Sequence, residues 1–224
     1  MERKYYEAYD DRYRQIHQAG LQWFYDDPTP IVEEIIEKFG VTYHHRMLEL
    51  GCGEGRDAGL LLSKGYDLLA TDISPEAIGY AQKKWPEFAE KFGVLDCVAD
   101  NMPEKFDFIY AVAVVHMLVE DTHRDAFYGF IRKHLTKQGI ALICSMGDGR
   151  MERQSDIHRA FDLQERIHEQ SGKQVKIANT SCRMVTFESF CEEIRRNGLV
   201  ILEKGVTSAP PDFPMLMYAV VKGE

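Results

Sequence analysis

The fold of this chain is decided by the stretch Met47-Leu48-Glu49-Leu50-Gly51-Cys52-Gly53-Glu54-Gly55-Arg56-Asp57. A short apolar run breaks into three glycines at alternate positions, and an apolar segment over residues 58–64 follows. This order predicts a strand, a tight turn and a helix. The glycines allow positive φ angles and lack the Cβ atoms that would keep a ligand away from the backbone. The helix N-terminus behind the turn offers free N–H groups to such a ligand.

A second apolar run, over residues 66–71, predicts the next strand, which ends at Asp72. Asp72 follows Gly51 by about 20 residues, the distance at which an open α/β fold places the carboxylate that binds the ribose hydroxyls. The sequence therefore predicts a nucleoside ligand at the glycine turn.

The details of the turn distinguish between nucleosides. The dinucleotide fingerprint is G-x-G-x-x-G, whereas the spacing here is G-x-G-x-G and Arg56 takes the place of the third glycine of that motif. A large cation there opposes the close packing of helix on strand that glycine allows. Glu49, just before the turn, would repel a pyrophosphate and suits a cationic ligand. An NAD-dependent dehydrogenase is thus a disfavoured alternative.

The stretch from Leu48 to Gly55 resembles the first motif of the class I S-adenosylmethionine-dependent methyltransferases, and the stretch from Thr71 to Ser74 resembles their second. S-adenosylmethionine has a sulfonium and an α-ammonium and no phosphate, in keeping with an acidic residue before the turn. The resemblance covers residues 46–146. It implies S-adenosylmethionine as the cofactor, S-adenosylhomocysteine as the product, and methyl transfer as the reaction.

The order of the predicted elements is that of an α/β protein. Strands and helices alternate from residue 46 to residue 198, and two further strands follow at residues 199–206 and 215–221. We expect a Rossmann-like, doubly wound sheet with helices on both faces and right-handed crossovers. The resembled family has seven strands in the order 3-2-1-4-5-7-6 with the last strand antiparallel, and this chain has elements of the right number and kind.

The length of the chain predicts a single domain over residues 1–224. Two of its regions lie outside the alternation of strands and helices. In the first, residues 1–28, Tyr5, Tyr9 and Tyr13 fall on one face of a predicted helix. This aromatic stripe either packs on the sheet or forms a lid over the cofactor with its rings near the sulfonium, and both can hold. The second, residues 148–180, is polar with a helix-like centre, and we expect an insertion that caps the acceptor pocket.

The resemblance implies a cofactor site at the carboxyl ends of the strands, where the strand order reverses. Gly51, Gly53 and Gly55 would cradle the methionine portion of the cofactor, and Glu49 would act on its ammonium. Asp72 would accept hydrogen bonds from both ribose hydroxyls.

The third strand is predicted at residues 94–99. The resemblance assigns the three residues that follow it to the adenine. Asp100 would accept a hydrogen bond from the adenine amino group, and the Asn101 backbone would reach the ring. Ile73 and Met102 would sandwich the base. Val112, at the end of the fourth predicted strand, would contact the cofactor.

The catalytic group is harder to identify, because a methyl sulfonium is already activated and the protein mainly aligns the nucleophile. His116 follows the fourth strand and is the candidate proton acceptor or substrate contact. The alternative is a hydrogen-bonded histidine at a strand end. No N-P-P-Y-type signature follows that strand, which disfavours methylation of amino groups in nucleic acid. His116, Glu120 and His123 have the spacing of metal ligands, but a loop is expected there, and no metal is predicted.

Several charged residues are candidates to line the acceptor pocket, although each also fits a solvated charged surface. They are Arg14, Asp148, Arg150, Arg153 and Arg183.

The composition is that of a soluble globular protein, with 224 residues, 45% apolar and 28% charged, and a net charge of −9. This charge disfavours nonspecific nucleic-acid binding, which depends on Lys and Arg. No apolar run reaches the roughly 20 residues of a membrane span, and the N-terminal Met-Glu-Arg-Lys has no apolar signal core behind it. The five cysteines form no C-x-x-C pair, which is typical of a reduced, cytoplasmic protein.

Together these features predict an S-adenosylmethionine-dependent methyltransferase that acts on a small-molecule acceptor by in-line transfer, as a monomer or homodimer. A tRNA or protein methyltransferase is an alternative within the same class. A cofactor-binding protein without methylation activity is an alternative outside it.

Overall fold

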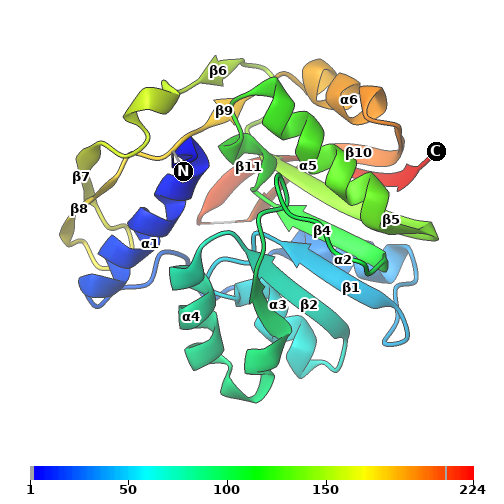
Figure 1. Ribbon diagram of the computed structural model, residues 1–224, viewed down its shortest axis with the longest axis horizontal. Coiled ribbons are helices and arrows are strands. Elements are labelled where there is room, and N and C mark those ends of the chain that lie inside the picture. Colours follow the sequence, from blue (N-terminus) through cyan, green and yellow to red (C-terminus); the bar gives the residue numbers. More distant parts are fainter. Residues whose placement is uncertain (1–2, 210) are drawn as a thin grey trace.

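A central seven-stranded sheet with helices on both faces organises the molecule, and the computed structural model describes residues 3–209 and 211–224 (Figure 1). The strands of this sheet are β1 (Arg46–Leu50), β2 (Asp67–Asp72), β3 (Phe92–Val94), β4 (Phe106–Val112), β5 (Leu135–Met146), β10 (Leu199–Ala209) and β11 (Phe213–Gly223). They lie in the order β3-β2-β1-β4-β5-β11-β10.

The strand directions confirm the predicted topology. The pairs from β3 to β5 are parallel, whereas β11 runs antiparallel to both β5 and β10. With the strands of this sheet numbered along the chain, the order is 3-2-1-4-5-7-6. The predicted Rossmann-like, doubly wound α/β fold with an antiparallel last strand is therefore confirmed. The strand order reverses between β1 and β4, so a crevice is expected at their carboxyl ends.

Five α-helices pack on the two faces of the sheet (Figure 1). One face is covered by α2 (Pro30–Lys38), α3 (Arg56–Ser63) and α4 (Pro75–Lys84), and the other by α5 (Asp121–His134) and α6 (Phe187–Arg196). Proline at the first helical position begins α2 and α4, as the sequence predicts. In the described parts of the chain, no helix is both long and apolar enough to cross a membrane.

The N-terminal segment, defined here as residues 3–28, lies across the end of the sheet. It contains η1 (Tyr5–Glu7) and α1 (Ala8–Gln18), and α1 packs against α4 on one side (Figure 1). Tyr5 and Tyr6 are buried in the same apolar core as the residues of β4 and α5. Tyr5, the first residue of the predicted aromatic stripe, thus has a packing role.

The insertion after β5 consists of short strands rather than a helix. β6 (Arg153–Gln154) pairs with β9 (Arg183–Met184), and β7 (Leu163–Ile167) forms an antiparallel pair with β8 (Gln174–Ala178). The expectation of a helical centre over residues 157–168 is wrong, since only η4 (Ile157–Arg159) is helical there. Val175 and Ile177 alternate inward on β8 and pack on Ile16 of α1. This long-range contact is not visible in the local pattern.

The third strand also differs from its prediction. It spans residues 92–94 rather than 94–99, and it follows η2 (Pro86–Lys91). Phe92 pairs with Ala70 of β2 and is buried, so it begins the strand. The residues after Val94 therefore reach the end of the sheet earlier than expected, which changes the residues available to a ligand.

A buried ion pair joins the two helices on the second face. Arg124 of α5 is fully buried, and its Nε and Nη2 lie 2.8 and 2.6 Å from the carboxylate oxygens of Glu193 on α6. Its Nη1 donates to the carbonyls of Val115 and Leu118, at 2.6 and 3.0 Å. These two carbonyls bracket η3 (Val115–Met117), so the pair also holds the turn that follows β4.

Replacing Glu193 by Gln is expected to lower the free energy of unfolding by about 3–5 kcal/mol, because it leaves the buried Arg124 charge uncompensated. Chemical denaturation of the two proteins measures the difference. The neighbouring Glu192 is exposed, and Glu192→Gln should change the stability by no more than about 0.5 kcal/mol. Equal effects of the two substitutions would contradict the structural role of the pair.

Candidate active site

The glycine turn at the end of β1 has no room for side chains. Gly51, Gly53 and Gly55 have φ angles of +75°, +54° and +78°, in the left-handed region that glycine favours. A Cβ on Gly53 would lie 2.6 Å from the Tyr13 hydroxyl, and one on Gly51 would lie 2.3 Å from a Val114 methyl. Gly55 instead allows α3 to pack closely on its neighbours, because a Cβ there would lie 2.9 Å from the Phe92 ring.

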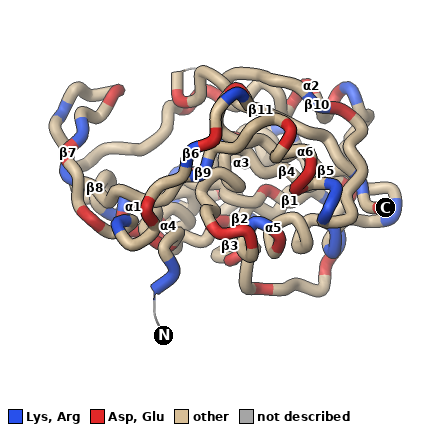
Figure 2. Tube along the Cα trace, turned by 90° about the horizontal axis from the view of Figure 1, so that it is seen from above, with Lys and Arg blue, Asp and Glu red and all other residues tan. Residues whose placement is uncertain are grey.

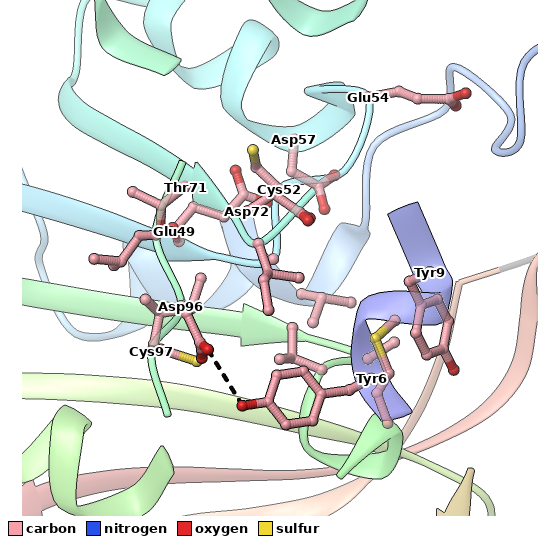
Figure 3. Close-up of a pocket in the computed structure, with 18 of the residues that line it drawn as sticks. Tyr6, Tyr9, Glu49, Cys52, Glu54, Asp57, Thr71, Asp72, Asp96 and Cys97 are labelled. Atoms are coloured by element: carbon pink, nitrogen blue, oxygen red, sulfur yellow. Dashed lines mark hydrogen bonds between the residues drawn. The ribbon is translucent and has the colours of Figure 1, made fainter. Parts of the chain in front are cut away.

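A cavity, called here the first cavity, lies at the carboxyl ends of β1, β2 and β4, where the strand order reverses (Figure 3). Five of the residues predicted to bind the cofactor line it, namely Glu49, Gly51, Asp72, Ile73 and Val112. Figure 3 shows Glu49, Cys52 and Asp72 grouped at the strand ends, with Tyr6 and Tyr9 of the N-terminal segment across from them. The sheet thus brings together residues that lie far apart in the sequence.

Asp72 is the last residue of β2 and is bound to the glycine turn. One of its carboxylate oxygens accepts a hydrogen bond from the Gly53 N–H at 2.9 Å, and the other accepts one from the Ser74 N–H at 2.8 Å. Burial raises the pKa of this carboxyl to about 6, although the two backbone donors oppose the rise. Asp72 therefore has a fixed orientation and remaining lone pairs for donors on a ligand.

Glu49 is buried at the floor of the first cavity. The Tyr110 hydroxyl donates to its carboxylate at 2.9 Å. Burial raises the pKa of Glu49 well above its usual value, and the nearby carboxylate of Asp57 raises it further. The Arg56 charge lowers the pKa of Glu49 but does not outweigh burial, and its guanidinium pairs with Asp212 at 2.9 Å and with Asp57 at 3.4 Å. A cationic group in the cavity would stabilise the ionised form of Glu49.

The three residues assigned to the adenine do not line the first cavity. Asp100 is exposed, and its side chain accepts a hydrogen bond from the Asp96 N–H at 2.9 Å. Oxygens of Asn101 and Met102 lie 3.2 and 3.1 Å from the His134 ring. Asp96, Cys97 and Val98 line the cavity in their place. The physical reason is the early end of β3, which moves the acidic position at the strand end from residue 100 to residue 96.

The N-terminal segment is tied to the cavity by contacts that the sequence analysis missed. Asp96 accepts hydrogen bonds from Lys4 at 2.6 Å and from the Tyr6 hydroxyl at 3.2 Å (Figure 3). Glu54, within the glycine turn, accepts from the backbone N–H groups of Trp23 and Phe24 at 2.6 and 3.0 Å. No sequence pattern marks Asp96 or Glu54 for these contacts, because their partners in the N-terminal segment are remote along the chain.

His17 connects the same segment to two acidic residues. Its Nε2 lies 2.9 Å from Glu54, and its Nδ1 lies 2.8 Å from Glu76 at the start of α4. An imidazole that contacts carboxylates through both nitrogens must donate from both, and so must be protonated. Burial lowers the pKa of His17, but the hydrogen bonds to Glu54 and Glu76 outweigh burial and raise it.

A second cavity, of about 670 Å³, adjoins the first. Tyr9, Tyr13 and Met117 line both cavities, and residues of β6, β7 and β8 line only the second. Its size lies within the range of small-molecule sites, about 300–1,000 Å³. The insertion after β5 therefore forms one wall of a space that opens toward the glycine turn.

His116 lines the second cavity and not the first. It is buried within η3 and makes no hydrogen bond in the described residues, where its Nδ1 has no partner. Among the described residues, no protein group supports the alternative of a hydrogen-bonded histidine at a strand end. Burial, with Arg124 and Arg12 nearby, lowers its pKa to about 3. A neutral imidazole faces any acceptor in this cavity.

Of the five charged residues considered for the acceptor pocket, only Arg153 lines the second cavity. Arg14 pairs with Asp10 and Asp11, and Arg183 donates to Asp121 at 2.7 Å. Arg150 and Asp148 lie near each other on the surface. Across residues 3–209 and 211–224, no group of three or more His, Cys, Asp or Glu side chains could hold a metal ion.

Comparison with known proteins agrees with this geometry. A family model described as a methyltransferase domain matches residues 47–139. The CcbJ methyltransferase from Streptomyces caelestis has a TM-score of 0.70 at 14% identity, with 96% of this chain and 98% of that chain covered. The glycopeptide N-methyltransferase MtfA, solved with sinefungin, has a TM-score of 0.66 at 18% identity, with 88% and 87% covered.

Among curated proteins, hemagglutinin 1 of Eikenella corrodens is 32% identical over 108 residues, which cover 46% of this chain and 35% of that protein. The chain thus spans about a third of the length of this relative.

Residues 47–139, which include the stretch that decides the fold, thus match a methyltransferase domain, and the chain has the fold of the class I S-adenosylmethionine-dependent methyltransferases. The resemblance found in the sequence is confirmed. S-adenosylmethionine is the cofactor of this class, and MtfA has been solved with it.

The His17 contacts predict a pH dependence of stability. Because the folded-state pKa of His17 is raised, its contribution is fully present below the ordinary histidine value of about 6.5 and is lost as the pH rises through the folded value. The free energy of unfolding of the native protein should fall across this range relative to that of His17→Gln. Urea denaturation at several pH values above about 6 measures both.

His158 provides a matched control, since it is an exposed histidine in the insertion. His158→Gln should keep the pH profile of the native protein. A His17→Gln profile parallel to the native one would show that His17 does not titrate between the two carboxylates.

Proposed function

We propose that this protein transfers a methyl group from S-adenosylmethionine to a small-molecule acceptor. The observation that supports this most strongly is the pair of adjoining cavities. The first is lined by buried carboxylates at the glycine turn, and the second is of small-molecule size and faces the first through shared aromatic side chains. The first cavity has the acidic and hydrogen-bonding groups that a cationic nucleoside would need, and the second has the size for the molecule that receives its methyl group.

The residues of the first cavity fit the chemical groups of the cofactor. Glu49 would stabilise the α-ammonium, and the backbone of the turn at Gly51 would approach the methionine portion. Asp72 would accept hydrogen bonds from the ribose hydroxyls. At the adenine, Asp96 replaces Asp100 as the proposed acceptor, with Ile73 against the base.

When bound, the cofactor supplies a methyl group activated by its sulfonium. The work of the chain is then to hold the acceptor in line and to exclude water. Tyr9, Tyr13 and Met117 surround the junction of the cavities and would do both. His116 would contact the acceptor as a neutral imidazole. With a pKa of about 3 it is a weak base, so the proposal favours a nucleophile that arrives unprotonated.

A small acceptor is favoured over tRNA or protein because the second cavity is bounded by the insertion on one side and by α1 on the other. In Figures 1 and 2, α1, β7 and β8 lie together at one end of the molecule. Macromolecular acceptors need an open surface, and a net charge of −9 opposes an RNA backbone.

The direct test is formation of S-adenosylhomocysteine from S-adenosylmethionine that has a labelled methyl group. Pools of small molecules are compared with bulk tRNA and with unfolded protein as acceptors. Label that appears in a small-molecule product supports the proposal. Label found only in tRNA or protein would move the protein to the alternative acceptor classes, and binding without any transfer would favour a cofactor-binding protein without methylation activity.

Replacing Asp72 by Ala should weaken the binding of S-adenosylhomocysteine by about 1.5–3 kcal/mol, the range for hydrogen bonds to a charged group. Titration calorimetry measures this change. Asp67 lies at the opposite end of the same strand and is exposed, so Asp67→Ala should leave the affinity unchanged. An unchanged affinity in Asp72→Ala would remove Asp72 from the cofactor site.

A further inference from the structure

The second cavity gathers positive charge in a chain whose net charge is −9. Three arginines line it, Arg12 from α1, Arg153 from β6 and Arg166 from β7. None of the three forms an ion pair with a carboxylate in the part of the chain that the structure describes. Arg153 and Arg166 are exposed, whereas Arg12 is buried, and a buried charge in a protein is normally paired, so Arg12 lacks its counter-charge.

Arg12 is the most buried of the three, with 8% of its surface exposed. Its Nε and Nη2 donate to the Ala178 carbonyl at 3.3 and 3.1 Å, and Nη2 also donates to the Asn179 carbonyl at 2.6 Å and to the Thr180 hydroxyl. Its Nη1 makes no hydrogen bond in the described residues. These neutral acceptors orient the guanidinium but leave its charge uncompensated.

Arg166 and Arg153 add to this charge from the insertion. Arg166 lies directly opposite Val175 in the β7–β8 pair, so the two side chains are on the same face, which lines the cavity. Burial lowers the pKa of Arg12 to about 10, and the positive charge of Arg166 lowers it further. The Arg12 and Arg153 charges both lower the pKa of Cys182, which is raised by burial. The three guanidiniums therefore act on one region of the cavity.

The acidic residues that line the second cavity do not cancel this charge. Asp212 already pairs with Arg56 at 2.9 Å. Glu169 is exposed and forms no ion pair with these arginines in the part of the chain that the structure describes. The three arginines therefore give this cavity a basic region, which includes Arg12. Two rings flank the basic region, since the Arg12 guanidinium lies 5.2 Å from the centre of the Tyr9 ring and 4.8 Å from that of Trp23.

We propose that the methyl acceptor is a small anion, and that Arg12, Arg153 and Arg166 bind its carboxylate or phosphate group in the second cavity. This inference rests on the proposed function, since it assigns the second cavity to the acceptor. Arginine suits the role, because its planar fork binds a carboxylate or phosphate through two parallel hydrogen bonds. The anionic group would lie at the basic region, and the rest of the molecule would extend toward Tyr13 and Met117, where the cavities meet.

The test uses four probes of similar shape, namely benzoate, phenyl phosphate, benzamide and benzylamine. Each is titrated into the protein saturated with S-adenosylhomocysteine, by calorimetry and by the fluorescence of Trp23, which lines the second cavity. Benzoate or phenyl phosphate should bind at least about tenfold more tightly than benzamide or benzylamine. The relative affinities of the two anions distinguish a carboxylate from a phosphate acceptor.

A variant series assigns the binding to the arginines. Arg166 is exposed at the cavity wall, so Arg166→Gln should fold normally, and it should weaken binding of the anion by about tenfold. Lys176 is the matched control, because it is an exposed cation on β8 that does not line the cavity. Lys176→Gln should bind the anion as the native protein does. Arg12→Lys, which keeps the charge, tests the buried position.

The two proposals fail in different ways. If S-adenosylhomocysteine does not bind, the proposed function fails. If it binds but neither anion does, or if benzamide or benzylamine binds as tightly, the anionic acceptor is overturned while the methyltransferase proposal stands. Equal losses in Arg166→Gln and Lys176→Gln would also overturn it, because they would indicate a general effect of charge.

Discussion

The structure depends on the burial of carboxylates around the glycine turn. Glu49 and Asp72 line the first cavity, and both side chains are buried. Burial raises the pKa of each, so neither is a stable anion without donors or a cation nearby. The backbone N–H groups at Gly53 and Ser74 partly satisfy Asp72. A ligand with a positive charge would stabilise the ionised form of Glu49, and its paired hydroxyls would donate to the free lone pairs of Asp72.

Charged side chains also determine how the N-terminal segment is held and what the second cavity can bind. Glu54 and Asp96 bind the segment over the first cavity through hydrogen bonds to its backbone and side chains. The charge that lines the second cavity is positive instead of negative, because the guanidinium of Arg12 there has no carboxylate partner among the described residues. The molecule therefore has an acidic cavity, the proposed site of the methyl donor, beside a basic cavity, the proposed site of the acceptor.

The resemblance to a known family was sufficient for the strand order, because the motifs that carry the resemblance are local. Local patterns of glycine and apolar residues were sufficient for the first cavity at Glu49, Gly51 and Asp72. The sequence failed where distant contacts decide the structure. The acidic residue that lines the first cavity after β3 is Asp96 rather than Asp100, since β3 begins at Phe92 through its pairing with β2. The insertion formed strands because Val175 and Ile177 pack on α1. The role of Arg12 could not be seen, since its partners lie on β8 and just after it.

The most direct test of the central claim is calorimetric titration of the native protein with S-adenosylmethionine, S-adenosylhomocysteine and NAD. The acidic site at the glycine turn predicts binding of the first two in the micromolar range and no binding of NAD, because a pyrophosphate, unlike an ammonium group, cannot compensate the ionised form of the buried Glu49. Binding of NAD in place of S-adenosylmethionine would contradict the account.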